Sequence, residues 1–230
     1  IAAALSNGLR FRSSPNNEAA APRIIGSMVR TLPTTAAAAL IQRTGSTEFT
    51  LTPLWAGDSR VYVLTAQGLS QLTVDDTTVP DPMDNLYEDG VLKNILSEGR
   101  VPRLRRKSIK LQAPFVVFAA TDGCFGYFST PMEFEGILLE TLATAKNAAR
   151  WEQLLIEGIG RVAGDDYTLC LAAYGFSSFE KMRRQFAPRL ELLRNAYLDQ
   201  LSRLPVTERS IRQSLWQHYQ PQYSCYMKEE

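Results

Sequence analysis

The chain contains the apolar run Phe115-Val-Val-Phe-Ala-Ala-Thr-Asp-Gly123, which stops abruptly at Asp122-Gly123. Its length is typical of a strand that is buried on both faces, and Asp-Gly is a common turn. A carboxylate at the end of a core strand has the rigid support that a metal or catalytic site needs. Most Asp-Gly pairs are only turns, so this segment alone does not indicate a function.

Three further segments also place a carboxylate beside an apolar run. Gly57-Asp58-Ser59-Arg60 lies between two such runs, and Leu72-Thr73-Val74-Asp75 follows the second of them. Asp165-Asp166-Tyr167-Thr168 stands just before a strand-like run. Together with Thr121-Asp122-Gly123, and in this order, they resemble the metal-dependent protein Ser/Thr phosphatases of the protein phosphatase 2C family, in their bacterial form. The match covers roughly residues 30 to 175.

The composition is that of an ordinary globular protein. The chain has 230 residues, of which 45% are hydrophobic and 21% charged, and this length is enough for one sizeable core. A formal net charge of +1 gives no global electrostatic reason to expect nucleic acid or an anionic membrane as partner. The three cysteines have neither a disulfide framework nor a zinc spacing, so we expect reduced thiols in a cytoplasmic protein.

The N-terminal end carries no targeting signal that we recognise. It lacks the basic start of a secretory signal, and no apolar run approaches the length of a membrane span. The chain opens without Met, in what reads as the middle of a helix, so we expect an N-terminally incomplete chain. A loop over residues 11 to 22 and a short helix over residues 23 to 31 are expected to follow.

Strand-like and helix-like patterns then follow in separate blocks. Residues 48–56 and 60–65 are expected to form a hairpin across Gly57-Asp58-Ser59. Thr130-Pro131-Met132-Glu133 predicts a helix start, and a second helix is expected to end at Gly164. The resemblance favours a strand over the Ala-rich residues 34–42, where local propensity favours a helix. The other expected strands cover residues 69–74, 108–111, 115–121 and 168–174.

From Ser177 onward the pattern is helical. A capping box at Ser177-Ser178-Phe179-Glu180 opens the segment, Pro188 is expected to kink or break the first helix, and Thr207 is expected to cap the last one. We expect an α+β fold. The resemblance implies a four-layer α-β-β-α sandwich with two mostly antiparallel sheets. We expect a phosphatase-like domain over residues 1–176 and a helical appendage over residues 177–230.

The resemblance also implies a chemistry. Hard cations such as Mn²⁺ and Mg²⁺ prefer oxygen ligands, and a pair of them can clamp a phosphate and activate water. The family is expected to hydrolyse phosphoserine and phosphothreonine in proteins through a metal-bridged hydroxide, with two ions and no protein nucleophile. Asp122 and Asp165 match the family's metal ligands, and Asp58 matches an aspartate implicated at a third, weaker site. Around the ligands we expect Gly123, Asp166 and Arg60.

Some departures from the family pattern weaken this expectation. Gly126 stands where the family often has a further Asp, and the segments that supply a phosphate-binding Arg and a bridging Asp are not found. The chain is therefore expected to be weakly active or inactive as given. The alternative is a non-catalytic, pseudophosphatase-like regulatory or binding module. The oligomeric state is left open, and residues 177–230 are a candidate scaffold for oligomerisation.

Other charged segments have plainer interpretations. The basic cluster Arg100, Arg103, Arg105, Arg106 and Lys107 is expected to be a solvated strand edge rather than a phosphosubstrate patch. The acidic residues between positions 75 and 84 lack the spacing of an EF-hand calcium loop. The aromatic residues near the C-terminus are expected to be packing residues, with a partner surface as the minority interpretation.

Overall fold

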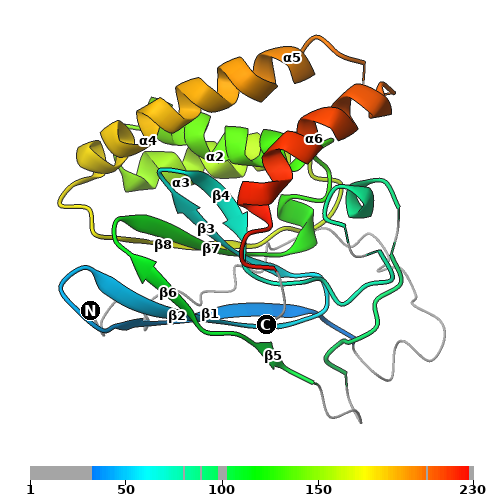
Figure 1. The fold of residues 1–230 in the computed structure, drawn as a ribbon, viewed down its shortest axis with the longest axis horizontal. Helices are drawn as coiled ribbons and strands as arrows, with labels where there is room; N and C mark the ends of the chain where they lie inside the picture. The colour runs from blue at the N-terminus through cyan, green and yellow to red at the C-terminus, as the bar shows by residue number, and fades with distance from the viewer. Residues whose placement is uncertain (1–32, 80, 89, 98–102, 206, 228–230) are drawn as a thin grey trace, which may run out of the picture.

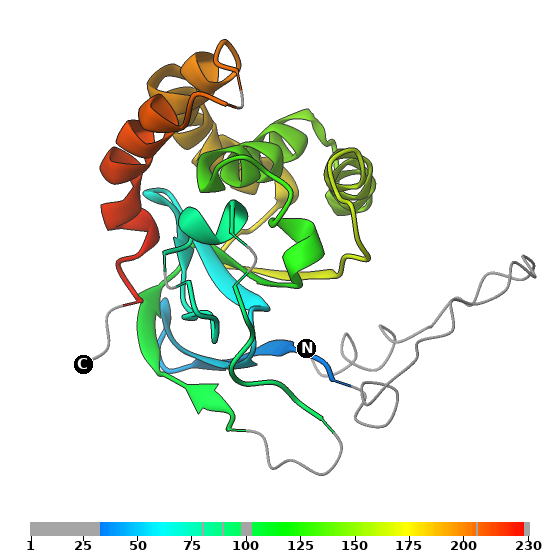
Figure 2. The same cartoon turned by 90° about the vertical axis from the view of Figure 1, so that its right-hand side faces the viewer.

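The computed structural model describes residues 33–79, 81–88, 90–97, 103–205 and 207–227. Two antiparallel sheets pack against each other, and the helices lie over one of them (Figure 1). The turned view in Figure 2 shows the same order of layers. The segments expected over residues 1 to 31 lie outside the described residues.

The first sheet contains β1 (Ala36–Arg43), β2 (Glu48–Ala56), β5 (Arg105–Arg106) and β6 (Ile109–Gln112). β2 pairs with β1 along one edge and with β5 and β6 along the other. The Ala-rich segment is therefore a strand, as the resemblance implied, because eight cross-strand pairs with β2 outweigh its local helix propensity.

The second sheet has the order β4 (Gly68–Gln71), β3 (Arg60–Thr65), β7 (Phe115–Ala120) and β8 (Leu169–Tyr174). Its central strands are buried on both faces, as the unbroken apolar runs predict. Val61, Val63 and Val117 belong to the core between the sheets, while Tyr62 and Phe118 belong to the core under the helices.

The expected hairpin between residues 48–56 and 60–65 is wrong. β2 and β3 are consecutive, but each pairs with strands of a different sheet. The Gly57-Asp58-Ser59 turn therefore carries the chain from one sheet to the other. Spacing along the sequence cannot distinguish the two cases, because both need a turn with the same residues.

The two central helices begin as predicted. α2 (Pro131–Thr144) has Thr130 as N-cap, whose side chain accepts a hydrogen bond from the Glu133 amide. α3 (Ala148–Gly160) follows an Asn147 cap and ends four residues before Gly164, where the sequence placed its end. Arg161 is the C-cap residue of α3, so the helix ends before the chain reaches that glycine.

The C-terminal helices pack on the same core as α2. α4 (Phe179–Leu193) is capped by Ser178 rather than Ser177 and continues through Pro188, so the expected break there is wrong. A π-helical turn, Arg194–Leu198, and α5 (Asp199–Leu201) extend it. α6 (Arg209–Tyr223) has Glu208, not Thr207, at its N-cap position. Residues of the C-terminal helices that share the core with Tyr62 are Met182, Phe186, Leu190, Leu193, Leu201, Trp216, Tyr219 and Tyr223.

The predicted α+β class and the two antiparallel sheets are confirmed. In the described part of the chain, the helices lie outside the β4-β3-β7-β8 sheet, and the outer face of the other sheet has no described helix (Figures 1 and 2). The boundary near residue 176 stays a prediction, although the last helices share one core with the strands. Among the described helices, none has the length and apolar character of a membrane span.

Candidate functional site

Asp58 and Asp122 lie at one end of the second sheet. Asp58 precedes β3 and Asp122 follows β7, and the strands pair antiparallel so that Arg60 stands opposite Ala120. Because the start of β3 meets the end of β7, two carboxylates that are far apart in sequence reach the same edge. Both border a cavity of about 210 Å³ and a second one of about 530 Å³.

The turn that carries Asp58 is held on both sides. Gly57 has a φ of 88°, and a Cβ there would lie 2.3 Å from Thr35 Cγ2. The Gly57 amide donates to Asp76 Oδ2 at 3.3 Å, and the Asp76 amide donates to the Gly57 carbonyl at 2.9 Å. Thr35 and Ser59 share a hydroxyl hydrogen bond of 2.8 Å. Asp58 therefore has the rigid support that a binding carboxylate needs.

The electrostatics of the two carboxylates are unfavourable without a cation. Burial raises the pKa of Asp58 above its ordinary value, and the negative charge of Asp122 raises it further. The guanidinium of Arg60 acts in the opposite direction but is the weakest of the causes. A positive charge between the two carboxylates would therefore relieve their repulsion.

The structure places Asp165 and Asp166 on the loop next to Gly123. The Thr121 amide donates to the Thr168 carbonyl at 3.1 Å, and the Thr168 amide donates to Thr121 Oγ1 at 2.9 Å. A Cβ on Gly123 would lie 2.3 Å from the Asp166 carbonyl oxygen, so only glycine permits this approach. Both aspartates are exposed, and neither borders the two cavities beside Asp58.

Arg60 is engaged by the protein itself. It is 1% exposed, and its guanidinium donates to both carboxylate oxygens of Asp75, with the shortest contact at 2.6 Å. Its Nη1 donates to Tyr62 Oη at 3.2 Å, and its Cζ lies 4.1 Å from the centre of the Phe125 ring. Arg60 thus stabilises the wall of the site and has little capacity left to bind a ligand.

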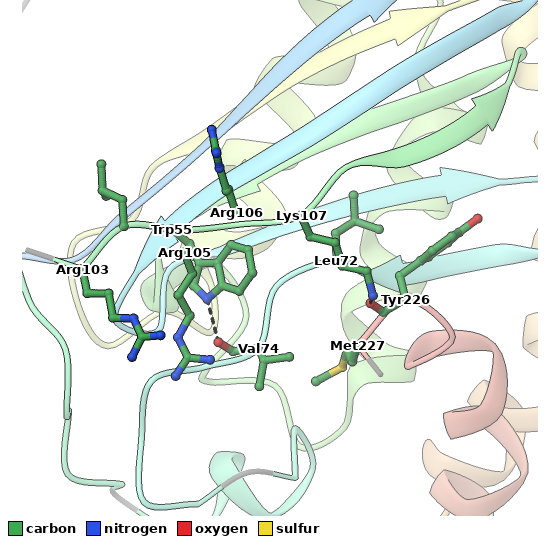
Figure 3. Close-up of a pocket in the computed structure, with 10 residues that line it drawn as sticks. Trp55, Leu72, Val74, Arg103, Arg105, Arg106, Lys107, Tyr226 and Met227 are labelled. Atoms are coloured by element: carbon green, nitrogen blue, oxygen red, sulfur yellow. Dashed lines mark hydrogen bonds between the residues drawn. The ribbon is translucent and has the colours of Figure 1, made fainter. Parts of the chain in front are cut away.

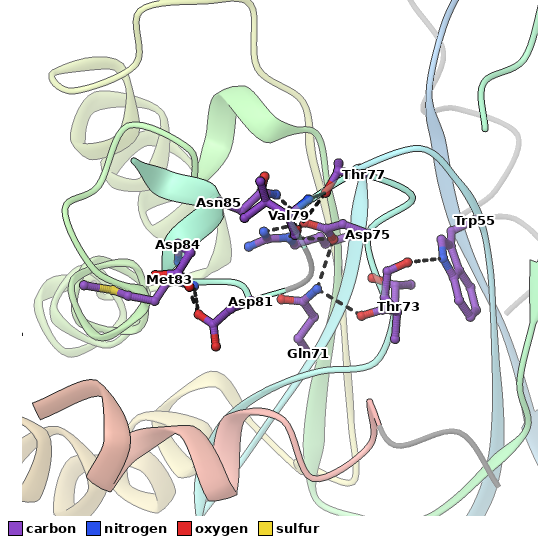
Figure 4. Close-up of polar contacts among 12 residues, drawn as sticks. Trp55, Gln71, Thr73, Asp75, Thr77, Val79, Asp81, Met83, Asp84 and Asn85 are labelled. Carbon is purple, nitrogen blue, oxygen red and sulfur yellow. Dashed lines mark hydrogen bonds and ion pairs between the residues drawn. The ribbon is translucent and has the colours of Figure 1, made fainter. Parts of the chain in front are cut away.

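Sequence reasoning missed the network around Asp75, although this residue ends the Leu72-to-Asp75 motif. Asp75 accepts from Gln71 Nε2 at 3.1 Å and from Asn85 Nδ2 at 2.8 Å (Figure 4). The motif matched the family pattern, but nothing in it showed that the carboxylate would be a structural acceptor.

The other acidic residues of this stretch also have protein partners. Asp76 binds Arg105 Nε at 2.7 Å and accepts from Asn94 Nδ2 at 2.7 Å. Asp81 accepts from the amides of Met83 and Asp84 (Figure 4), which starts the short 3₁₀ turn Asp84–Leu86. These partners give the two carboxylates structural roles.

The donor set fits a divalent cation only in part. Oxygen ligands are what Mn²⁺ and Mg²⁺ prefer, and Asp58 and Asp122 supply them at one edge. In the part of the chain that the structure describes, however, no group of three or more His, Cys, Asp or Glu side chains is close enough to hold a metal ion. The described residues therefore provide a carboxylate pair rather than a complete metal centre.

Only the comparison with solved structures finds proteins that are similar to this chain. No protein-family model and no curated protein sequence matches the chain. The Ser/Thr phosphatase PstP/Ppp of Mycobacterium tuberculosis is similar at 24% identity, over 60% of this chain and 59% of the other, with a TM-score of 0.47. PppA of Pseudomonas aeruginosa is similar at 22% identity, over 59% and 56% of the two chains, with a TM-score of 0.44.

A structure of the PstP catalytic domain in complex with two manganese ions is similar at 24% identity, over 60% of this chain and 57% of the other, with a TM-score of 0.40. The two PstP structures are named as Ser/Thr phosphatases, and PppA is named as a key regulatory component of the T6SS. This chain spans less than two thirds of their length. The likeness is one of fold, and it assigns no activity to the chain.

Proposed function

We propose that this chain contributes to a metal-dependent phosphatase that acts on phosphoserine and phosphothreonine in proteins. The observation that carries the proposal is the convergence of Asp58 and Asp122, from the ends of the paired strands β3 and β7, on the border of two shared cavities. Two structures of one neighbour, PstP, are named as a Ser/Thr phosphatase, one of them with two manganese ions, and this agrees with the proposal.

In this proposal Asp58 and Asp122 hold a divalent cation, Mn²⁺ or Mg²⁺, and the neighbouring loop moves toward them on metal binding so that Asp165 adds a third carboxylate. A cation bound there would polarise a phosphate ester and favour attack by water. Gly123 keeps the Asp166 backbone close to Asp122, and the Arg60–Asp75 pair keeps the wall beside Asp58 in place. The metal-assisted mechanism and the use of two ions stay predictions.

The two cavities suggest how a phosphorylated residue would lie. Asn85 and Tyr127 give the smaller cavity polar groups beside the carboxylates. Pro33, Leu92 and Ile95 give the larger one an apolar lining on the other side. We propose that the phosphate faces the polar cavity while flanking apolar parts of a protein substrate contact the larger one. A cytoplasmic location and the absence of nucleic acid or membrane partners stay predictions.

Two measurements test the proposal. The first is Mn²⁺ binding followed by electron paramagnetic resonance, and the second is turnover of p-nitrophenyl phosphate and of a phosphothreonine peptide with Mn²⁺. We expect weak binding and slow turnover, both lost in Asp122→Asn and reduced in Asp58→Asn and Asp165→Asn. Asp199→Asn is the matched control, because Asp199 is an exposed carboxylate on α5.

The outcomes separate the candidate functions. Unchanged Mn²⁺ binding and turnover in folded Asp122→Asn protein would refute the assignment of this carboxylate. If the folded protein binds Mn²⁺ without turnover, or shows neither Mn²⁺ binding nor turnover, the non-catalytic module would be favoured instead. Equal losses in Asp122→Asn and Asp199→Asn would show that the effect is one of net charge.

A further inference from the structure

A cavity of about 660 Å³ (Figure 3) has, among the described residues, no lining residue in common with the two cavities beside the carboxylate pair. Its volume is within the range of small-molecule sites, about 300–1,000 Å³. Part of its lining comes from the segment around β5, part from the stretch after β4, and part from the residues that follow α6. It therefore joins segments that are distant in sequence.

One side of this cavity is cationic. Arg103, Arg105, Arg106 and Lys107 line it, and none of its lining residues in the described part of the chain is acidic. Asp76 pairs with Arg105, and Lys107 Nζ donates to the Tyr226 carbonyl at 3.2 Å. The described lining therefore includes four cationic residues, of which Arg105 has Asp76 as a carboxylate partner. In Figure 3 the guanidinium groups of Arg103 and Arg105 extend toward the same side as Val74, whereas Arg106 extends away from them.

The opposite side is apolar and partly aromatic. Trp55 is 5% exposed, and its Nε1 donates to the Val74 carbonyl at 2.7 Å, so its polar atom is satisfied and its ring acts as a wall. Leu72 is buried beside it. Tyr226 and Met227, both half-buried, complete this side (Figure 3). Aromatic rings and a thioether are suited to contact a flat apolar group.

The register of β5 explains why the two sides meet. Arg105 stands opposite Trp55, and Arg106 stands opposite Leu54, in the antiparallel pairing with β2. Successive side chains of a strand point to opposite faces, so Arg105 shares a face with Trp55 while Arg106 points to the other face. The arginine nearest the aromatic wall is thus fixed by the sheet, and the direction of Arg106 in Figure 3 follows from the same alternation.

We propose that this cavity binds a small organic phosphate that carries a flat aromatic group. Its phosphate contacts Arg103 and Arg105, since guanidinium groups match phosphate oxygens in geometry and charge. Its aromatic part lies against Tyr226, Val74 and Met227. An inorganic anion lacks the contact with the apolar side, and a neutral aromatic compound lacks the contact with the arginines, so both bind more weakly than the organic phosphate. Among the described residues this site shares no lining residue with the cavities beside the carboxylate pair, and the inference does not rest on the phosphatase proposal.

The test uses adenosine 5′-monophosphate as probe, with adenosine and inorganic phosphate as partial ligands. Binding is measured by calorimetry and by tryptophan fluorescence, in buffer with a chelator so that metal-dependent turnover plays no part. We expect adenosine 5′-monophosphate to bind at least about tenfold more tightly than either partial ligand. The fluorescence change is expected to disappear in Trp55→Phe, because the other two tryptophans, Trp151 and Trp216, lie in the core under the helices.

Two matched variants distinguish a specific binding site from nonspecific electrostatic attraction to a basic surface. Arg103→Ala is expected to weaken binding about tenfold, whereas Arg106→Ala removes the same charge from a side chain that points elsewhere and has a smaller effect. Equal losses in the two variants would overturn the proposal, as would the absence of adenosine 5′-monophosphate binding. Tighter binding of a poly-glutamate peptide would also overturn it, because the surface would then dock an acidic protein segment.

Discussion

Arg60 and Asp75 form a buried ion pair that joins the start of β3 to the segment after β4. Arg60 Nη2 lies 2.6 Å from Asp75 Oδ2, and the two side chains are 2% and 5% exposed. Burial lowers the pKa of Arg60, but the charge of Asp75, together with smaller contributions from Tyr62 and Tyr223, more than offsets this, so the pKa of Arg60 lies well above its ordinary value. The pair lies directly behind the turn that carries Asp58, so the wall of the candidate site depends on it.

Removal of one partner is expected to be costly, because the other charge stays buried without compensation. We expect Asp75→Ala to lower the free energy of unfolding by about 3–5 kcal/mol, measured by urea denaturation. Arg60→Met together with Asp75→Leu leaves no buried charge and is expected to recover part of that loss. A change below about 1 kcal/mol in Asp75→Ala would show that the pair has little role in stability.

A second buried network links α2, α4 and α6 through Glu135. Arg189 Nε and Tyr219 Oη donate to its two oxygens at 2.7 and 2.6 Å. We expect Tyr219→Phe to lower the free energy of unfolding by about 1.5–3 kcal/mol, because the bond goes to a charged acceptor. Tyr127→Phe, at a 49% exposed side chain, is the matched control and is expected to change stability little. Equal effects in the two variants would contradict the role of this bond.

The buried tyrosines give the fold a limit at alkaline pH. Burial raises the pKa of Tyr62 above 10.0 and that of Tyr219 and Tyr223 well above it. Below pH 10 these tyrosines are neutral in both the folded and the unfolded protein, and their contribution to the free energy of unfolding is fully present. As the pH rises further, the unfolded chain ionises first, so stability falls by up to about 1.4 kcal/mol per pH unit for each tyrosine. Absorbance at 295 nm measures the ionisation of the tyrosines. Reversible ionisation of all nine tyrosines near pH 10 in the folded protein would contradict the prediction.

The three cysteines are expected to differ in reactivity. Burial raises the pKa of Cys124 to about 11, and its side chain is 1% exposed, while Cys170 and Cys225 are exposed. At pH 8, iodoacetamide should therefore label Cys170 and Cys225 while Cys124 stays protected until the protein unfolds. Peptide mass spectrometry with and without urea measures this. Labelling of Cys124 at the rate of Cys170 in folded protein would show that its thiol is accessible.

The approach of Gly123 to the Asp166 backbone can be tested by adding one methyl group. A Cβ in Gly123→Ala would lie 2.3 Å from the Asp166 carbonyl oxygen, so the loop with Asp165 must move away from Asp122. We expect a loss of Mn²⁺ affinity of about tenfold or more, with a smaller relative effect on unfolding. Gly45→Ala is the control, because its nearest neighbours belong to the side chain of Glu48. Unchanged Mn²⁺ affinity would separate the Asp165 loop from the site.

Much of the fold could be predicted from local pattern. The unbroken apolar run Phe115–Ala120 is typical of a strand that is buried on both faces. The N-cap residue Thr130 followed by Pro131 marks the start of α2. The pairing of the strands could not be predicted in the same way. Gly57-Asp58-Ser59 reads as a hairpin turn, yet it connects two sheets, because partners such as Thr35 and Asp76 come from distant segments.

Apart from the Ala-rich strand β1, the sequence by itself determined where most strands and helices lie, and it placed carboxylates at their ends, because burial periodicity and capping are local properties. Only the tertiary structure decided which of these carboxylates share an environment. It brought Asp58 beside Asp122, committed Asp75 and Asp76 to buried hydrogen bonds, and assembled a basic cavity from β5, Trp55 and the residues after α6. Such assignments depend on contacts between distant segments, and no local pattern records them.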